Sequence, residues 1–252
     1  MVELQGISVK YPSRKGIDAR WILKAVSLTI RPGQNLALVG ESGSGKTTLA
    51  RVLAGVLTPA EGRVVWQPTA GKGKTGLVGY VFQNYTQSLD PRQTVAQAFE
   101  ESLERRSGKA AVDLEAFVGS LRLEPAVLRL KPHQLSGGMC QRVAIGRAVL
   151  LKPDLLIMDE STNALDYRRQ VEVVDLVKAL QKDCGFSTLW ITHDLMVAAY
   201  ACDSFAFMKA GRIVSEVEGQ RALAGLQDPY ARRLVELAGQ LGGAWHGQSA
   251  EV

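Results

Sequence analysis

The sequence predicts an α/β fold, and three stretches carry that prediction. A short apolar run at 36–39 leads into the glycine-rich segment Gly40–Thr48, which is followed by a helical pattern. A second apolar run at 155–158 ends in two adjacent carboxylates, and a third at 186–191 ends close to a histidine. Ligands bind at the carboxyl ends of the strands in open α/β sheets, so we expect these three ends to form one site.

The glycine-rich segment has the spacing G-x-x-x-x-G-K-[ST] of a phosphate loop, and it lies between a strand and a helix as that loop requires. We expect Gly40, Gly43 and Gly45 to take backbone angles that other residues avoid, which lets main-chain N–H groups approach a phosphate. Lys46 is expected to reach the β- and γ-phosphates, and the Thr47 hydroxyl to bind Mg²⁺. A glycine-rich turn that binds nothing is the alternative, but it does not explain why all these features coincide. The predicted phosphate-binding residues are Gly40, Glu41, Ser42, Gly43, Ser44, Gly45, Lys46, Thr47 and Thr48.

Composition limits the class of protein. Of the 252 residues, 46% are hydrophobic and 22% are charged, which is ordinary for a globular chain. No apolar run approaches the roughly 18 residues of a transmembrane helix, and the alternating N-terminus lacks the apolar stretch of a signal peptide. We therefore expect a cytoplasmic protein. The net charge of +5 comes without a Lys/Arg block, which argues against nucleic acid as a partner. Cys140, Cys184 and Cys202 match no metal-binding spacing and are expected to be reduced thiols.

The order of the patterns predicts how the parts are arranged. Alternating runs at 3–11 and 22–30 are expected to pair as an N-terminal antiparallel β subdomain. Helical patterns predict an inserted helical subdomain at about 92–152. We expect a single domain over 1–241 and a disordered tail at 242–252. The predicted fold class is thus α/β, a phosphate-loop NTPase core with these two additions.

The remaining elements follow from the same periodicities. The expected strands are 62–67 and 77–82 with a hairpin of 204–208 and 212–218, and the expected helices are 94–106, one from Asp113 onward, one from Ser136 to about Leu151, 168–183, 195–200 and 228–241. Segments 68–76 and 84–95 are expected to be a flexible connection and a polar loop. The charged residues of the first inserted helix are expected to form its solvated face, namely Glu100, Glu101, Glu104, Arg105 and Arg106.

Two carboxylates follow the run at 155–158. Asp159 suits a ligand of Mg²⁺, as in phosphate-loop nucleotide hydrolases, and Glu160 suits a general base or water-orienting group. A purely structural acid pair would need buried cationic partners, and none is apparent nearby in the sequence. His193 follows the run at 186–191 on the same edge of the sheet, which favours contact with a γ-phosphate.

The residues alone leave two interpretations open for each of two features. Tyr11 ends the first strand, and it is either a packing aromatic or a platform on which a nucleobase stacks. Ser136 is a candidate N-cap with Gly137 and Gly138 just inside the helix. Glycines there cost about 1 kcal/mol each relative to alanine. They therefore indicate either close approach of an anionic group or a tight helix–helix contact.

Taken together, these motifs resemble the ATP-binding subunits of ABC transporters over nearly the whole chain. Each motif alone is weak, but all of them occur in order and at the family's spacings. Beyond the phosphate loop, the matching positions are Tyr11 for the adenine-stacking aromatic, Gln83 for the Q-loop, 135–141 for the signature, 155–160 for Walker B, 163–166 for the D-loop and His193 for the switch histidine.

The resemblance implies that ATP with Mg²⁺ is bound between Gly40–Thr48 of one chain and Ser136, Gly137 and Gly138 of a second, identical or similar ATPase subunit. It implies transmembrane permease subunits as partners, a substrate-binding protein reached through them, and a peripheral place on the cytoplasmic face of the membrane. The implied catalytic residues are Lys46, Gln83, Glu160 and His193, and the implied metal ligands are Thr47, Gln83 and Asp159.

Finer similarity points to the peptide/nickel importer branch, which implies peptides, nickel or a metal chelate as cargo. The segments that carry it are 82–95 and 228–236. Asn84-Tyr85 replaces that branch's usual acidic-Pro pair, and Ser161 stands where a proline usually follows the catalytic glutamate. The Cys-rich C-terminal extension of some members is absent, so an iron–sulfur cluster is not implied. These departures bear on the cargo and leave the ATP chemistry intact.

Three other functions compete with this interpretation. A soluble ABC-type ATPase of DNA repair or translation usually carries a second ATPase domain, a coiled coil or DNA-binding modules, none of which is present. A phosphate-loop kinase or GTPase would not need the signature, and a GTPase should show N-K-x-D, which is missing. A binding-only subunit with a dead site is opposed by the intact Lys46, Asp159, Glu160 and His193.

Overall fold

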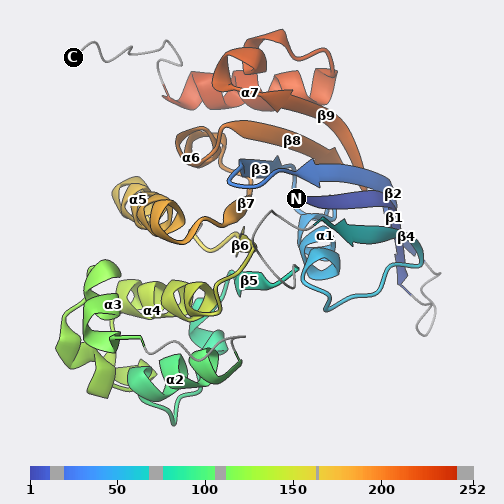
Figure 1. Cartoon of the computed structure of the whole chain (residues 1–252). Coiled ribbons are helices and arrows are strands. Elements are labelled where there is room, and N and C mark those ends of the chain that lie inside the picture. The colour runs from blue at the N-terminus through green and yellow to red at the C-terminus, as the bar shows by residue number, and fades with distance from the viewer. Residues whose placement is uncertain (12–19, 68–75, 106–111, 163–164, 243–252) are drawn as a thin grey trace.

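The computed structural model describes residues 1–11, 20–67, 76–105, 112–162 and 165–242, and its fold is α/β as predicted (Figure 1). In this part of the chain the strands form a three-stranded and a six-stranded sheet. Some of the predictions fall outside the described residues. They concern Arg106, most of the 68–76 connection, the first half of 163–166 and the tail beyond 242.

The three-stranded sheet is antiparallel and lies at the N-terminal end of the chain. Its strands are β1 (Val2–Tyr11), β2 (Arg20–Ile30) and β4 (Glu61–Trp66), in the order β2-β1-β4. Val2 lies opposite Ile30 in one pairing and opposite Trp66 in the other. The predicted antiparallel pair of N-terminal strands is therefore confirmed, and β4 extends it.

The six-stranded sheet brings together the strand ends that the sequence singles out. Its order is β5-β6-β7-β3-β8-β9, and only β9 runs antiparallel to its neighbour. Val39 pairs with Thr192, and Asp159 pairs with Ile191. The carboxyl ends of β3, β6 and β7 thus meet at one edge, as predicted. The strands are β3 (Asn35–Val39), β5 (Val78–Val81), β6 (Leu155–Asp159), β7 (Ser187–Thr192), β8 (Ser204–Lys209) and β9 (Arg212–Glu218).

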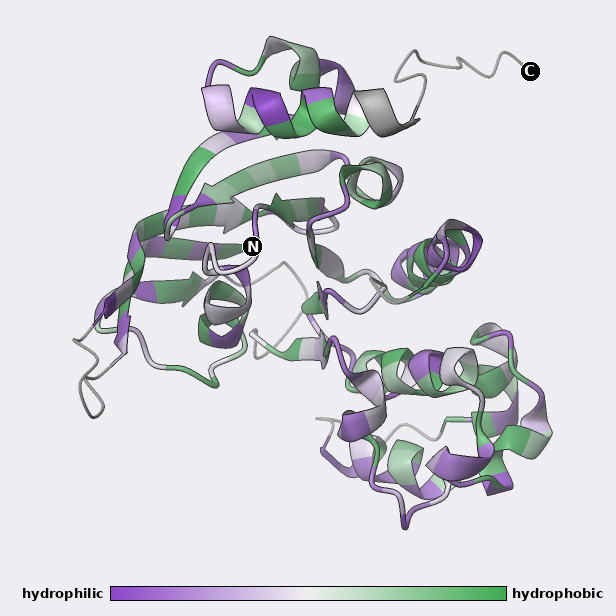
Figure 2. Ribbon diagram, turned by 180° about the vertical axis from the view of Figure 1, so that it is seen from behind, coloured by the Kyte–Doolittle hydropathy of each residue, from purple (hydrophilic) through white to green (hydrophobic). Residues whose placement is uncertain are grey.

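Alternate residues of β3 belong to two different cores. Leu36 and Leu38 pack with the three-stranded sheet and with α1, whereas Ala37 and Val39 pack with the helices on the other face. All four side chains are at most 3% exposed. Figure 2 shows the apolar residues following the strands, while the helices carry polar residues on part of their surface. This is the burial expected of a central strand in a parallel sheet.

The helices end close to the predicted positions. Figure 1 shows α2, α3 and α4 grouped together, away from the three-stranded sheet. Ser136 accepts a hydrogen bond from the Met139 N–H, which confirms the predicted cap of α4. The helices are α1 (Lys46–Leu53), α2 (Val95–Arg105), α3 (Leu114–Ser120), α4 (Gly137–Leu150), α5 (Tyr167–Cys184), α6 (Leu195–Ala201) and α7 (Pro229–Gly242).

The structure also contains short 3₁₀-helices that the sequence did not predict. One of them, η1 (Tyr85–Ser88), lies inside the expected polar loop 84–95. Such helices are a turn or so long, so they leave no periodic pattern in the sequence. The others are η2 (Pro125–Arg129), η3 (Pro132–Gln134) and η4 (Gln220–Gly225).

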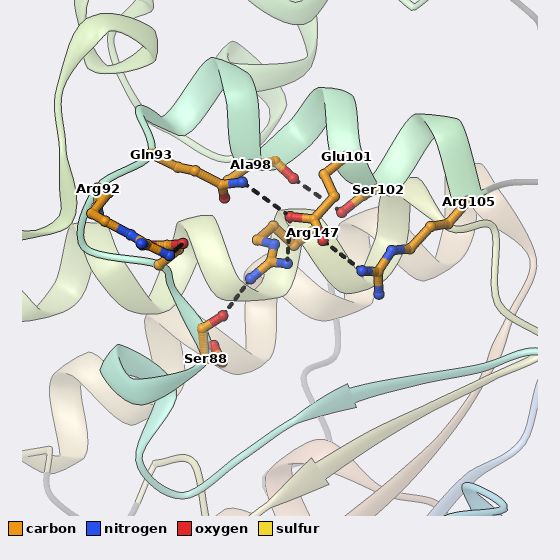
Figure 3. A network of polar contacts seen from close by, with 9 residues as sticks. Ser88, Arg92, Gln93, Ala98, Glu101, Ser102, Arg105 and Arg147 are labelled. Carbon is orange, nitrogen blue, oxygen red and sulfur yellow. Dashed lines mark hydrogen bonds and ion pairs between the residues drawn. The ribbon is translucent and has the colours of Figure 1, made fainter.

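The predicted solvated face of α2 is only partly correct at Glu101, whose side chain is 31% exposed. Its carboxylate accepts hydrogen bonds from Arg105 at 2.7 Å and from Gln93 at 3.4 Å, and it lies 3.8 Å from Arg147 of α4 (Figure 3). Arg147 also donates to the carbonyl oxygen of Ser88 in η1. Periodicity finds the apolar face of α2, but it cannot show that α4 places a cation at the border of that face.

Gly211, between β8 and β9, gives a test of the fold. Its φ is +83°, and a Cβ there would lie 2.2 Å from the carbonyl oxygen of Ile22. Gly211→Ala should lower the free energy of unfolding by more than about 2 kcal/mol, because left-handed strain of about 1–2 kcal/mol adds to a backbone clash that no rotamer relieves.

The control is Gly185→Ala. Gly185 has a φ of +70° and a ψ of 34°, in the left-handed helical region, but nothing lies within 4 Å of its ideal Cβ, so only the strain applies. Denaturant unfolding of both variants measures the difference. Equal destabilisation would show that the close approach at Gly211 has no energetic weight.

Candidate active site

The phosphate loop connects β3 to α1, and its glycines serve two different purposes. Gly43 and Gly45 have φ values of +79° and +110°, as predicted. Gly40 does not have a positive φ, so that part of the prediction is wrong. A Cβ at Gly40 would lie 2.2 Å from the carbonyl oxygen of Met208 in β8. Glycine is needed there for close packing between neighbouring strands.

Lys46 begins α1 and is 4% exposed. Its ammonium donates to the carbonyl oxygens of Gly40 at 2.7 Å and Glu41 at 2.9 Å, and it lies 3.9 Å from a carboxylate oxygen of Glu160. Burial lowers the pKa of Lys46, while Glu160 and Asp159 act in the opposite direction. The cation is therefore held inside the loop, close to both acids that the sequence singled out.

Asp159 ends β6 and receives a hydrogen bond on each carboxylate oxygen. The Thr47 hydroxyl donates to one at 3.1 Å, and the Tyr80 hydroxyl donates to the other at 2.6 Å. Burial raises the pKa of Asp159, and the two hydrogen bonds lower it. The predicted metal ligands Thr47 and Asp159 are thus in direct contact.

Glu160 and His193 lie at the same edge of the sheet. Glu160 has a φ of +48°, and its N–H donates to the Ile191 carbonyl oxygen at 2.9 Å. This left-handed residue turns the chain at the end of β6, so Glu160 does not simply alternate with Asp159 across the strand. His193 is exposed and follows Thr192, the residue of β7 that pairs with Val39. Two of the predicted catalytic residues therefore lie at the end of the sheet from which the phosphate loop starts.

Gln83 lies two residues beyond β5 and is exposed. It lines a hollow of about 370 Å³ together with Thr47, Asp159 and Arg51. All three predicted metal ligands therefore border one space. Tyr11 ends β1 with 39% of its surface exposed, which opposes the core-packing interpretation of that ring.

Ser136, Gly137 and Gly138 are not brought to the phosphate loop of the same chain. They line a second hollow, of about 510 Å³, that shares no lining residue with the hollow at Thr47. A Cβ at Gly138 would meet nothing within 4 Å, and one at Gly137 would meet only the Tyr85 hydroxyl, at 3.6 Å. The alternative of a tight helix–helix contact within the chain is therefore not supported at either glycine.

Comparison with known proteins decides the family. The family profile described as ABC transporter matches residues 23–163. The chain belongs to the ABC transporter family. It is 34% identical to the metal-staphylopine import system ATP-binding protein CntF of Staphylococcus aureus, over 94% of this chain and 98% of CntF. It is 32% identical to the probable D,D-dipeptide transport ATP-binding protein DdpF of Escherichia coli, over 94% of this chain and 78% of DdpF.

A solved structure supports the enzymatic assignment of this ABC ATPase. The dimeric, post-hydrolysis ATP-binding cassette MJ0796, bound to ADP and Pi, is 29% identical with a TM-score of 0.73 over 86% of this chain and 98% of MJ0796. The chain is thus an ATP-binding and ATP-hydrolysing subunit, and the soluble ATPase of DNA repair or translation is not favoured. Among the described residues, no helix is both long and apolar enough to span a membrane.

Sequence reasoning missed two residues of the site. The Tyr80 hydroxyl donates a hydrogen bond to Asp159. The sequence indicated this residue only through a tyrosine within an apolar strand, where a buried hydroxyl needs a hydrogen-bond partner. Gln141 of α4 is fully buried, and its amide nitrogen donates to the Ser161 carbonyl oxygen at 2.7 Å. This bond ties the signature helix to the residue after Glu160. An amide on the buried face of α4 was the available signal.

Removing the Tyr80 hydroxyl should make the ATPase more sensitive to acid. Tyr80→Phe keeps the ring, which lies 4.4 Å from that of Phe82, but loses the hydrogen bond that favours the charged form of Asp159. The pKa of Asp159 then rises, so the carboxylate is protonated at higher pH. We expect the acidic limb of the ATPase pH profile to move to higher pH, and the rate on that limb to fall about 5- to 10-fold.

Steady-state rates across the acid and neutral range measure this shift. Tyr167→Phe is the control, since Tyr167 is 55% exposed on α5 and should leave the profile in place. An acidic limb of Tyr80→Phe that coincides with that of the wild type would refute the role of the hydroxyl.

Proposed function

We propose that this chain is the ATPase subunit that energises an importer of peptides, nickel or a metal chelate. The observation that carries the ATPase role is the convergence of Lys46, Asp159 and Glu160 at one edge of the parallel sheet. The cargo class rests on the importer-like segments 82–95 and 228–236. It is also supported by the likeness to DdpF and CntF, whose names refer to D,D-dipeptide transport and metal-staphylopine import.

The site residues divide the work of hydrolysis. Lys46 and the main-chain N–H groups at the start of α1 bind the phosphates of ATP, where a helix N-terminus favours negative charge. Glu160 orients and polarises the attacking water. Gln83 and His193 contact the γ-phosphate side of the site, and Tyr11 supplies the stacking surface for adenine.

Mg²⁺ fits the oxygen-rich group formed by Thr47, Gln83 and Asp159, which we propose as its ligands. The Thr47 hydroxyl already meets a carboxylate oxygen of Asp159, and Gln83 borders the same hollow. Hydroxyl, amide and carboxylate oxygens are the donors this cation prefers. When bound, Mg²⁺ supplies positive charge that neutralises phosphate oxygens.

The chain acts with partners. The separate hollow at Ser136–Gly138 supports a composite site in which these residues contact ATP held by the phosphate loop of a second ATPase subunit, identical or similar. We assign the surface at Gln83 and the inserted helices to transmembrane permease subunits. Arg147 supports this, because it joins Ser88, near Gln83, to α2 of the insertion (Figure 3). A substrate-binding protein is reached only through the permeases, which hold the chain at the cytoplasmic face of the membrane.

The proposed role of Glu160 predicts a separation of binding from turnover. Glu160→Gln keeps the shape of the side chain and removes its basicity, so ATP binding should persist while hydrolysis falls about 10²- to 10⁴-fold. Nucleotide titration and phosphate release measure the two steps. The exposed Glu61 gives the control Glu61→Gln, which should hydrolyse normally. Near-normal turnover by Glu160→Gln would remove Glu160 from the mechanism.

The composite site predicts which of the two subunits loses ATP trapping when the signature of one subunit is mutated. In mixed dimers of a tagged Ser136→Arg chain and an untagged wild-type chain, ATP trapping should be lost at the wild-type phosphate loop. The loop at Lys46 of the variant chain should keep its ATP, because its signature comes from the intact partner. Photolabelling with a reactive ATP analogue reads the two chains separately by size. Loss confined to the variant chain would mean that the signature acts within its own chain.

A further inference from the structure

The C-terminal element 228–236 contacts the phosphate loop. Tyr230, the second residue of α7, accepts a hydrogen bond on its hydroxyl oxygen from the Glu41 N–H at 2.9 Å. Glu41 is the residue after Gly40 in the phosphate-loop segment. The sequence singled out 228–236 only as an importer-like stretch, and the mechanism above gives it no task. The hydrogen bond gives it a direct link to the nucleotide site.

Tyr230 is held in place from its own side. The Lys209 ammonium lies 4.7 Å from the centroid of its ring, a cation–π contact. Asp228 fixes the start of the helix, because its carboxylate accepts from the Ala231 N–H at 2.9 Å. The side chain is half-buried, and burial is the main cause that raises the pKa of its hydroxyl. Tyr230 thus presents a neutral oxygen acceptor at a defined position.

On the loop side, Glu41 connects Tyr230 to the catalytic cation. Its N–H points to Tyr230, while its carbonyl oxygen accepts from the Lys46 ammonium at 2.9 Å. The neighbouring strands brace the same loop, since Gly211 donates its N–H to the Ser44 carbonyl oxygen at 2.9 Å. The phosphate loop is therefore hydrogen-bonded both to the β8–β9 turn and to α7.

We propose that Tyr230 is a positioning residue for the phosphate loop, which makes the C-terminal element part of the nucleotide site. The Glu41 N–H bonds to the Tyr230 hydroxyl, and a fixed phenol orders the loop better than exchanging water does. Tyr230 acts through Glu41 and Lys46 and not by touching ATP. This inference rests on the ATP site of the proposed function.

The test is Tyr230→Phe in the full-length chain. Phenylalanine keeps the ring and its contact with Lys209 and removes only the acceptor oxygen. We expect the Kd and KM for ATP to rise about 3- to 10-fold, because ATP binding must then order a loop that the phenol no longer fixes. The kcat should stay the same, because the loss affects ground state and transition state alike. The Tm of the nucleotide-free chain should also stay within about 2 °C of the wild type.

Tyr200→Phe is the matched control. The Tyr200 hydroxyl donates to Asp175 at 2.7 Å, and the Lys178 ammonium lies 4.7 Å from its ring centroid, so this variant also loses one phenolic hydrogen bond beside a lysine. None of these groups belongs to the phosphate loop. The Kd and KM for ATP of this variant should equal those of the wild type.

Two results would overturn the proposal while leaving the ATPase assignment intact. The first is an unchanged Kd for ATP in Tyr230→Phe. The second is a lower kcat accompanied by a lower Tm of the nucleotide-free chain, which would make Tyr230 a support of the fold. A wild-type chain that does not bind ATP would instead refute the proposed function, and this inference with it.

Discussion

The burial of the Lys46 ammonium is the constraint on which the rest of the site depends. A cation with 4% exposure needs oxygen partners at short range, and the loop supplies two carbonyls while Glu160 adds a carboxylate. The loop can offer those carbonyls only if it curls back on itself, which Gly43 and Gly45 permit. The curl in turn requires fixed neighbours, and these come from β8, the β8–β9 turn and α7.

Much of the fold could be predicted from the sequence, because many of its helices and strands are determined by residues that are close together in the chain. The buried runs at 36–39 and 155–158 and the cap at Ser136 depend on residues a few positions apart, and all are as predicted. Of the site, the residues at the ends of β3, β6 and β7 could also be located, because parallel strands bring their ends together.

What could not be predicted depends on contacts between distant residues. The bond of Tyr80 to Asp159 spans 79 positions, and that of Tyr230 to Glu41 spans 189. The true reason for Gly40, close contact with Met208, likewise appears only once β3 and β8 are neighbours. Glu101 was expected in solvent for the same reason, since nothing local reveals Arg147 on another helix. Sequence patterns therefore identify the residues of the site more readily than the distant residues that hold those side chains in position.

The left-handed backbone at Glu160 sets folding and function against each other. A non-glycine residue at a φ of +48° costs about 1–3 kcal/mol, and glycine would adopt the same angle without that cost. Selection for stability alone would therefore replace this glutamate with glycine. The carboxylate that we propose as the general base thus lies where the fold favours glycine, so the chain gives up part of a narrow stability margin at a residue of its proposed site.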